Sequence, residues 1–124
     1  MTKTARKIFS DIINCEISLY TTLYGPDKAV VPISDIIRFN EGLSRYSARK
    51  ALKELIKEDL ICFTSQGRPA IESIGEYREL VCEAMPPVNG YALTRKGFES
   101  EPFRESYKAW EKSMAEWAEG GSND

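Results

Sequence analysis

The 124-residue sequence contains no histidine, and its three cysteines, Cys15, Cys62 and Cys82, stand far apart. A structural zinc site needs about four Cys or His ligands at close spacing, so the composition excludes one. Histidine is also the commonest general base, and neither a glycine-rich phosphate loop nor a nucleophile elbow occurs. We therefore expect a protein that is not an enzyme and has no cofactor. The cysteines are expected to be reduced thiols that are buried or half-buried.

Long apolar segments are missing as well. No run approaches the roughly 18 residues that a membrane span needs, and the N-terminal stretch MTKTARKIFSD lacks the apolar core of a signal peptide. With 42% hydrophobic and 29% charged residues, the composition is typical of a soluble globular protein. These features predict a cytoplasmic protein without a membrane partner. We expect one domain over residues 1–119 and a flexible tail over 120–124.

The net charge of −2 is unevenly distributed along the chain. Residues 1–98 carry 14 Lys and Arg against 12 Asp and Glu, whereas residues 99–124 carry 3 against 7. Within 38–57, six basic residues are opposed by two acidic ones, Glu41 and Glu54. Because local potential decides where a polyanion docks, the segment 38–57 is a candidate nucleic-acid surface inside an acidic protein.

Apolar residues at spacings of three and four predict a long first helix over about residues 3–24, which ends at Gly25-Pro26. Its apolar face is wide, which indicates burial on more than one side, including against a partner chain. The residues of this face are Ile8, Phe9, Ile12, Ile13, Cys15, Ile17, Leu19, Tyr20 and Leu23.

Two further helices are expected on either side of the turn Asn40-Glu41-Gly42, where Gly42 suits a positive φ. Ser34 and Ser44 are their expected N-caps. The apolar face of the second helix comprises Ile36, Ile37 and Phe39, and Leu43 is expected to fill the space between the two helices. The third helix, 45–59, is expected to turn Ala48, Leu52, Leu55 and Ile56 toward the core and its basic and polar residues outward.

Strands are expected after the third helix. The segments that read as strands are 29–32, 60–64, two stretches of 70–84 on either side of Gly75, and 90–94, which Lys96-Gly97 closes. The apolar spacing within 70–84 also allows a helix, and strands are the favoured interpretation. A turn is predicted over Ser65–Pro69, with Arg68 as its basic tip.

The last helix is predicted over 102–118. Its bulky side chains follow spacings of 4, 3, 4 and 3, which is a heptad-like seam. The seam comprises Phe103, Tyr107, Trp110, Met114 and Trp117. One interpretation is core packing on the first helix of the same chain, and the other is a homodimer interface with the first helix of a second chain.

The core, residues 31–97, resembles the winged helix-turn-helix superfamily of bacterial transcription regulators, of the broad MarR/PadR/GntR kind. The resemblance is carried by Gly42-Leu43-Ser44, the Ala48…Ala51-Leu52…Leu55 pattern, Leu60-Ile61, Gly67-Arg68 and Tyr91-Ala92-Leu93-Thr94-Arg95-Lys96-Gly97. It implies an α+β, mainly α fold, a winged helix-turn-helix that the long first helix and the last helix would flank. The chain departs from the family pattern in an enlarged wing, because about twenty-two residues separate Gly67-Arg68 from Gly90, more than a simple hairpin needs. It also implies sequence-specific binding of double-stranded DNA and transcriptional regulation, with helix 45–59 in the major groove.

Under this resemblance, Arg45 and Arg49 are the candidate base contacts, since a guanidinium pairs bidentately with guanine. Tyr46 and Ser47 are candidates for phosphate or a thymine methyl, while Lys50 and Lys53 are candidates for phosphate.

Arg68 is expected to reach a neighbouring minor groove or the backbone. Two other functions use the same domain: a replication-initiation or excision accessory protein of a phage or mobile element, and a winged helix that contacts only proteins. Nothing in the sequence specifies a small-molecule effector.

Overall fold

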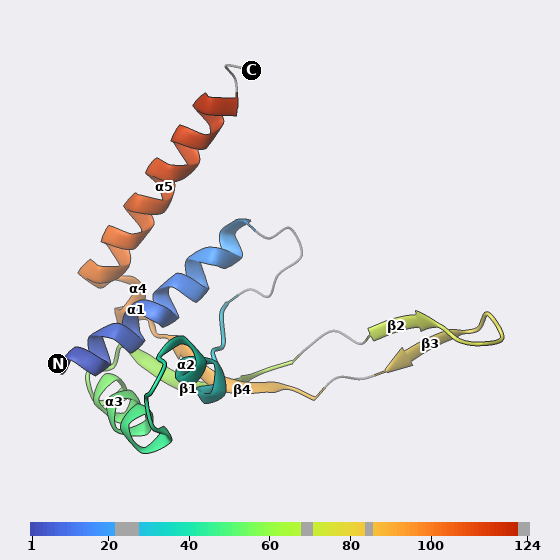
Figure 1. The fold of residues 1–124 in the computed structure, drawn as a ribbon, viewed down its shortest axis with the longest axis horizontal. Coiled ribbons are helices and arrows are strands. Elements are labelled where there is room, and N and C mark those ends of the chain that lie inside the picture. Colours follow the sequence, from blue (N-terminus) through green and yellow to red (C-terminus); the bar gives the residue numbers. More distant parts are fainter. Residues whose placement is uncertain (22–27, 68–70, 84–85, 122–124) are drawn as a thin grey trace.

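The computed structural model describes residues 1–21, 28–67, 71–83 and 86–121 (Figure 1). Helix α1, Lys3–Ser18, starts after Thr2, whose Oγ1 accepts a hydrogen bond from Ala5 N at 3.2 Å. The 3-10 turn η1, Leu19–Thr21, follows directly. The α-helix is therefore shorter than predicted, because the Ser18 and Thr21 hydroxyls donate to nearby main-chain carbonyls and compete with helical hydrogen bonding. The remainder of the predicted helix, 22–24, lies outside the described residues.

Helix α1 is the centre of the hydrophobic core. The side chains it buries are Ala5, Ile8, Phe9, Ile12, Ile13 and Ile17. They contact α3, Arg45–Lys57, on one side and α5, Glu101–Gly121, on another, with α2 and β4 completing the enclosure. The prediction of burial on more than one side is confirmed, and elements of the same chain provide the burial.

Helix α2, Ile33–Phe39, has Pro32 rather than Ser34 as its N-cap residue, so the predicted N-cap is wrong. Pro32 is extended, with a φ of −64° and a ψ of 154°, and its carbonyl accepts from Asp35 N and Ile36 N. Ile36 is fully buried, whereas Phe39 is 44% exposed, contrary to expectation. The short helix ends at Phe39, so no later turn covers its ring.

The turn after α2 and the start of α3 agree with the prediction. Gly42 has a φ of +83°, and Ser44 caps α3 by accepting from Ser47 N at 3.1 Å. Helix α3 ends at Lys57, two residues before the predicted end, because Asp59 adopts a φ of +60°. Leu60 N then returns to the Leu55 carbonyl at 3.1 Å, which is the geometry of a helix C-cap.

Strands β1, Ile61–Gln66, and β4, Val88–Leu93, pair antiparallel, with Ile61 opposite Leu93. The small strand predicted at 29–32 is present as a single bridge, in which Val31 and Tyr91 exchange hydrogen bonds of 2.8 and 2.9 Å. These pairings place β1 and β4 against the helices.

A second ladder joins β2, Ile71–Ile74, to β3, Leu80–Glu83, which confirms two strands around Gly75. The turn predicted over 65–69 is wrong at Ser65 and Gln66, because both belong to β1, and residues 68 and 69 lie outside the described residues. The chain reverses at Gly75–Glu79. Gln66 pairs with Val88 and Ile71 with Glu83, so four residues separate the two ladders on each side and the register is preserved. Figure 1 shows the hairpin β2–β3 projecting away from the helices. Arg68 lies outside the described residues.

The segment after β4 is helical rather than a strand closure. Thr94 caps the short helix α4, Arg95–Phe98, by accepting from Gly97 N, so the prediction for Lys96-Gly97 is wrong. Helix α5 continues through Gly120 and Gly121, which were expected to belong to a flexible tail, and 122–124 lie outside the described residues. The fold is α+β and mainly helical, as predicted.

Three further findings concern the described residues. Cys15 and Cys62 are half-buried, but Cys82 is exposed on the hairpin, contrary to expectation. Among these residues, no group of three His, Cys, Asp or Glu side chains is arranged to hold a metal ion. No helix in the described ranges has the length and apolarity to cross a membrane.

Candidate nucleic-acid interface

Helix α3 has two opposite faces. The buried side chains are Ala48, Ala51, Leu52 and Leu55. The exposed ones include Arg45, Tyr46, Arg49, Lys50 and Lys53. At roughly 100° per residue, these five fall within an arc of about 140°, so one face of the helix carries them all. We call this set the basic face of α3.

The basic face of α3 carries uncompensated positive charge. The helix contains five Lys and Arg residues and one acidic residue, Glu54. Within the described part of the chain, none of the four cations of the basic face forms an ion pair. These four groups are therefore available to an external anion.

Glu54 is directed away from the basic face. Its carboxylate accepts from Thr2 N at 2.8 Å and from Thr2 Oγ1 at 2.9 Å. These hydrogen bonds lower the pKa of Glu54 below its ordinary value. These hydrogen bonds hold the start of α1 against α3. They join residues that are 52 positions apart in the sequence, so no local sequence pattern predicts them.

Ser47 has a structural partner. Its backbone N–H donates to Ser44 Oγ, and the Ser44 hydroxyl donates to Ser47 Oγ at 3.0 Å. The residue is half-buried, unlike its predicted companions on the exposed face. Ser47 therefore orients the first turn of α3, where its neighbours are most exposed.

Ile56 was expected in the core but is 42% exposed. It follows Arg49 by seven residues and Leu55 by one, so the helical rotation places it beside the arginines rather than beside the leucine. An apolar side chain thus extends the basic face of α3, with Tyr46, 77% exposed, as its aromatic member. The helical spacing of Ile56 from Arg49 could have predicted its exposure from the sequence.

The turn between α2 and α3 is attached to α1. Asn40 Nδ2 donates to Asp11 Oδ2 and to the Ile36 carbonyl, both at 2.8 Å. Arg38, the other basic residue of this region, pairs with Asp35 at 2.7 Å. The orientation of α3 is thereby fixed relative to the core, while Arg38 is partly neutralised.

The hairpin β2–β3 has different chemistry from α3. Residues 71–83 contain four Glu and a single Arg, Arg78. Ile74 and Leu80 face each other across the strands at 78% and 67% exposure, and Tyr77 in the turn is 86% exposed. This apolar and acidic tip is not suited to phosphate.

The five seam residues of α5 divide into two groups. Phe103 is buried at 9% exposure, and Tyr107 and Trp110 pack on Tyr20, with ring centroids 6.1 and 5.7 Å apart. These contacts favour the core-packing interpretation for the first half of the helix. Met114 is half-buried, while Trp117 is 74% exposed.

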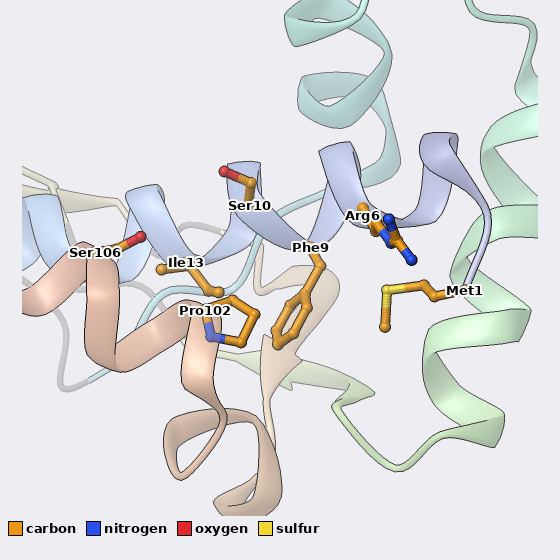
Figure 2. A pocket seen from close by; sticks show the side chains of 7 residues that line it. All are labelled: Met1, Arg6, Phe9, Ser10, Ile13, Pro102 and Ser106. Atoms are coloured by element: carbon orange, nitrogen blue, oxygen red, sulfur yellow. The ribbon is translucent and has the colours of Figure 1, made fainter.

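Sequence reasoning missed a pocket between α1 and the start of α5, with a volume of about 370 Å³. It is lined by Met1, Arg6, Phe9, Ser10, Ile13, Pro102 and Ser106 (Figure 2). Figure 2 shows α1 and α5 lying side by side with these residues between and around them. The pocket joins residues almost a hundred positions apart, so it has no local signal in the sequence.

Comparison with protein-family models, curated proteins and solved structures yields no match to this chain.

Proposed function

We propose that the chain is a winged helix-turn-helix protein that binds double-stranded DNA sequence-specifically and regulates transcription. The observation that carries the proposal is the basic face of α3, whose cations are exposed and lack ion-pair partners in the described residues. The order α2, turn, α3, β1 and β4, with the Val31 bridge, supports the same class.

The dimensions of α3 suit the major groove, which admits one α-helix. Arg45 and Arg49 are four residues apart, so their Cα atoms are separated by roughly 6 Å along the helix axis. This is close to two base steps of about 3.4 Å, so both guanidinium groups can reach base edges in one groove. Lys50 lies at the other edge of the arc and Lys53 near its middle, and both would contact phosphates.

A homodimer is the second part of the proposal. A two-fold protein reads a palindromic site with one recognition helix in each half-site. The exposed Trp117 and the acidic second half of α5 support an interface on that helix, distant from the DNA-binding residues.

A second candidate function is protein contact alone. The observation that favours it is the acidic hairpin β2–β3 with the exposed residues Ile74, Tyr77 and Leu80. This candidate predicts no sequence preference for any duplex, so the same experiment separates the two.

The test is selection of a binding site from a random duplex library, followed by affinity measurement on the selected site. We expect Arg49→Ala to cost about 1–3 kcal/mol and to relax the preference at one base position. The double variant Arg45→Ala/Arg49→Ala should lose selection, while Lys108→Ala, an exposed cation on α5, should bind as the parent does.

Failure to select any site, or an unchanged affinity in the double variant, would sink DNA binding by α3. The genomic position of the selected site then assigns the role. A site in a promoter supports regulation, and a site at an origin or attachment sequence supports the replication or excision alternative.

A further inference from the structure

Helix α5 extends beyond the elements that support it. Its first half packs on α1 and η1, whereas its second half projects past them (Figure 1). Trp117 in this second half is 74% exposed. No part of the described chain covers this indole. A large exposed apolar side chain of this kind is typical of a protein-protein interface.

The pocket between α1 and α5 is complementary to Trp117 in its apolar lining and in its size. Its lining includes the apolar residues Phe9, Ile13 and Pro102 (Figure 2). Pro102 is exposed, whereas Phe9 and Ile13 are buried core residues beneath the pocket. Its volume of about 370 Å³ is at the small end of the ligand-sized range and accommodates one aromatic side chain.

Trp117 and the pocket occur on the same face of α5. Ser106 lines the pocket, and Trp117 follows it by eleven residues, so the two directions differ by about 20° around the helix. Two α5 helices that pair antiparallel through this face bring Trp117 of one over Ser106 of the other.

A single two-fold axis allows both pockets of the dimer to be filled at once. When the partner's Trp117 enters the pocket of the first chain, symmetry places Trp117 of the first chain in the partner's pocket. No second interface is needed, and the assembly closes as a dimer rather than extending as a filament.

The distribution of charge also supports Trp117 of a second chain as the side chain that fills the pocket. Arg6 lines the pocket, and Glu116 immediately precedes Trp117. Both side chains are exposed, and neither forms an ion pair within the ranges that the structure describes. The first ten residues carry three cations and no acid, whereas 111–119 carry three Glu and one Lys. The antiparallel arrangement brings these opposite charges together.

We infer that two copies of the chain form a two-fold dimer in which the α5 helices pair antiparallel and each Trp117 fills the partner's α1–α5 pocket. The inference deepens the homodimer of the proposed function by naming its interface, and it uses none of the residues of the basic face of α3.

The first test is sedimentation equilibrium of the full chain over a wide concentration range. We expect Trp117→Ala to raise the dimer dissociation constant by about 100-fold or more, since a buried indole is a typical hot spot and occurs twice here. The matched control is Lys108→Ala, on the opposite face of α5, which should leave the dissociation constant unchanged. A parent chain that remains monomeric, or a dimer indifferent to Trp117→Ala, would overturn the inference.

Charge reversal tests the register. Arg6→Glu and Glu116→Arg should each weaken the dimer, and the double variant Arg6→Glu/Glu116→Arg should recover most of the loss. A double variant no tighter than either single variant would exclude this antiparallel register.

Fluorescence gives a direct reading of the pocket. The chain has two tryptophans, so in Trp110→Phe the emission comes from Trp117 alone. We expect its maximum to shift to shorter wavelength as the protein concentration rises through the dimer transition. An unshifted maximum in a sample that is dimeric by sedimentation would place Trp117 outside the interface.

The dimer proposal and the DNA-binding proposal can be tested independently of each other. Arg45→Ala/Arg49→Ala should dimerise normally, and Trp117→Ala should still bind a single half-site. If the dimer is absent but the half-site is bound, this inference fails while the proposed function stands.

Discussion

Gly90 and Gly97 lie where two segments of backbone meet. A Cβ at Gly90 would stand 2.5 Å from the Val31 carbonyl group, and one at Gly97 would collide with the Leu60 carbonyl oxygen. Gly90 directly precedes, and Gly97 ends, the Tyr91–Gly97 segment that carries the resemblance to winged-helix regulators. Close approach, rather than a positive φ, is therefore what both positions require.

We predict that Gly97→Ala lowers the free energy of unfolding by about 1–3 kcal/mol, because the added methyl group meets backbone that cannot rotate away. Urea denaturation measures the change. The control is Gly120→Ala in α5, which has nothing within 4 Å and should stabilise the helix by up to about 1 kcal/mol. Equal stability of the Gly97→Ala protein and the parent would contradict the steric argument.

Glu16 is a buried carboxylate at 4% exposure, and its Oε2 accepts from Ala29 N at 2.6 Å. Burial raises the pKa of Glu16 above 4.5, although the hydrogen bond from Ala29 and the charge of Lys28 oppose the shift. Because the raised pKa belongs to the folded state, folding favours the protonated form. The associated stability is complete below the unfolded pKa and is lost as the pH rises through the folded pKa.

We therefore predict that Glu16→Gln, which keeps an oxygen to accept from Ala29, removes this loss. The difference in unfolding free energy between variant and parent should grow in favour of the variant as the pH rises from below 4.5 toward neutrality. Thermal or urea unfolding across that range measures it, with Glu105→Gln on exposed α5 as the control. A difference that does not vary with pH would show that Glu16 is not the titrating group.

At the scale of elements, the hairpin β2–β3 differs from the ladder β1–β4 both in packing and in charge. The ladder β1–β4 packs against α1, whereas the hairpin projects from it with four Glu and one Arg (Figure 1). Phosphate repels such a tip, so under the proposed function we expect the distal hairpin to add nothing favourable to DNA affinity.

We predict that replacing residues 71–83 with Asn-Gly, a two-residue hairpin turn, leaves the affinity for the selected DNA site within about twofold or improves it. Arg68 remains in this variant. Fluorescence anisotropy at fixed salt measures the affinity, and circular dichroism checks that the helices persist. A large loss of affinity would mean that the acidic hairpin contacts the duplex.

The elements with strong local signals were predictable from the sequence. Gly42 and Ser44 each act through their own backbone neighbourhood, and both occur as expected. The errors arose where non-local packing decides the outcome. Phe39 follows the periodicity of α2, but the helix ends before anything covers it. The Thr2–Glu54 contact and the α1–α5 pocket join distant segments, which no local pattern reveals.

At the scale of the whole molecule, opposite charges are separated rather than mixed. The net charge is −2, yet α3 contains five cations and one acid, and residues 99–124 have an excess of four acidic residues. Charges farther apart than a Debye length of about 8–10 Å are screened at ordinary ionic strength. Under the proposed function, a DNA duplex at α3 would therefore experience the local positive field rather than the net charge.

This separation predicts a steep salt dependence of DNA binding in an acidic protein. Each phosphate neutralised by a cation releases counterions, so log K should fall linearly with log salt, with a slope of about −0.9 per phosphate contact. Lys53→Ala should reduce the steepness of that slope by about 1 per chain and weaken binding to all duplexes alike. Lys112→Ala, an equal loss of charge on the exposed surface of α5, should leave the slope unchanged. Identical slopes for Lys53→Ala and the parent would remove Lys53 from the contact surface, and an equal effect of Lys112→Ala would show that net charge governs binding.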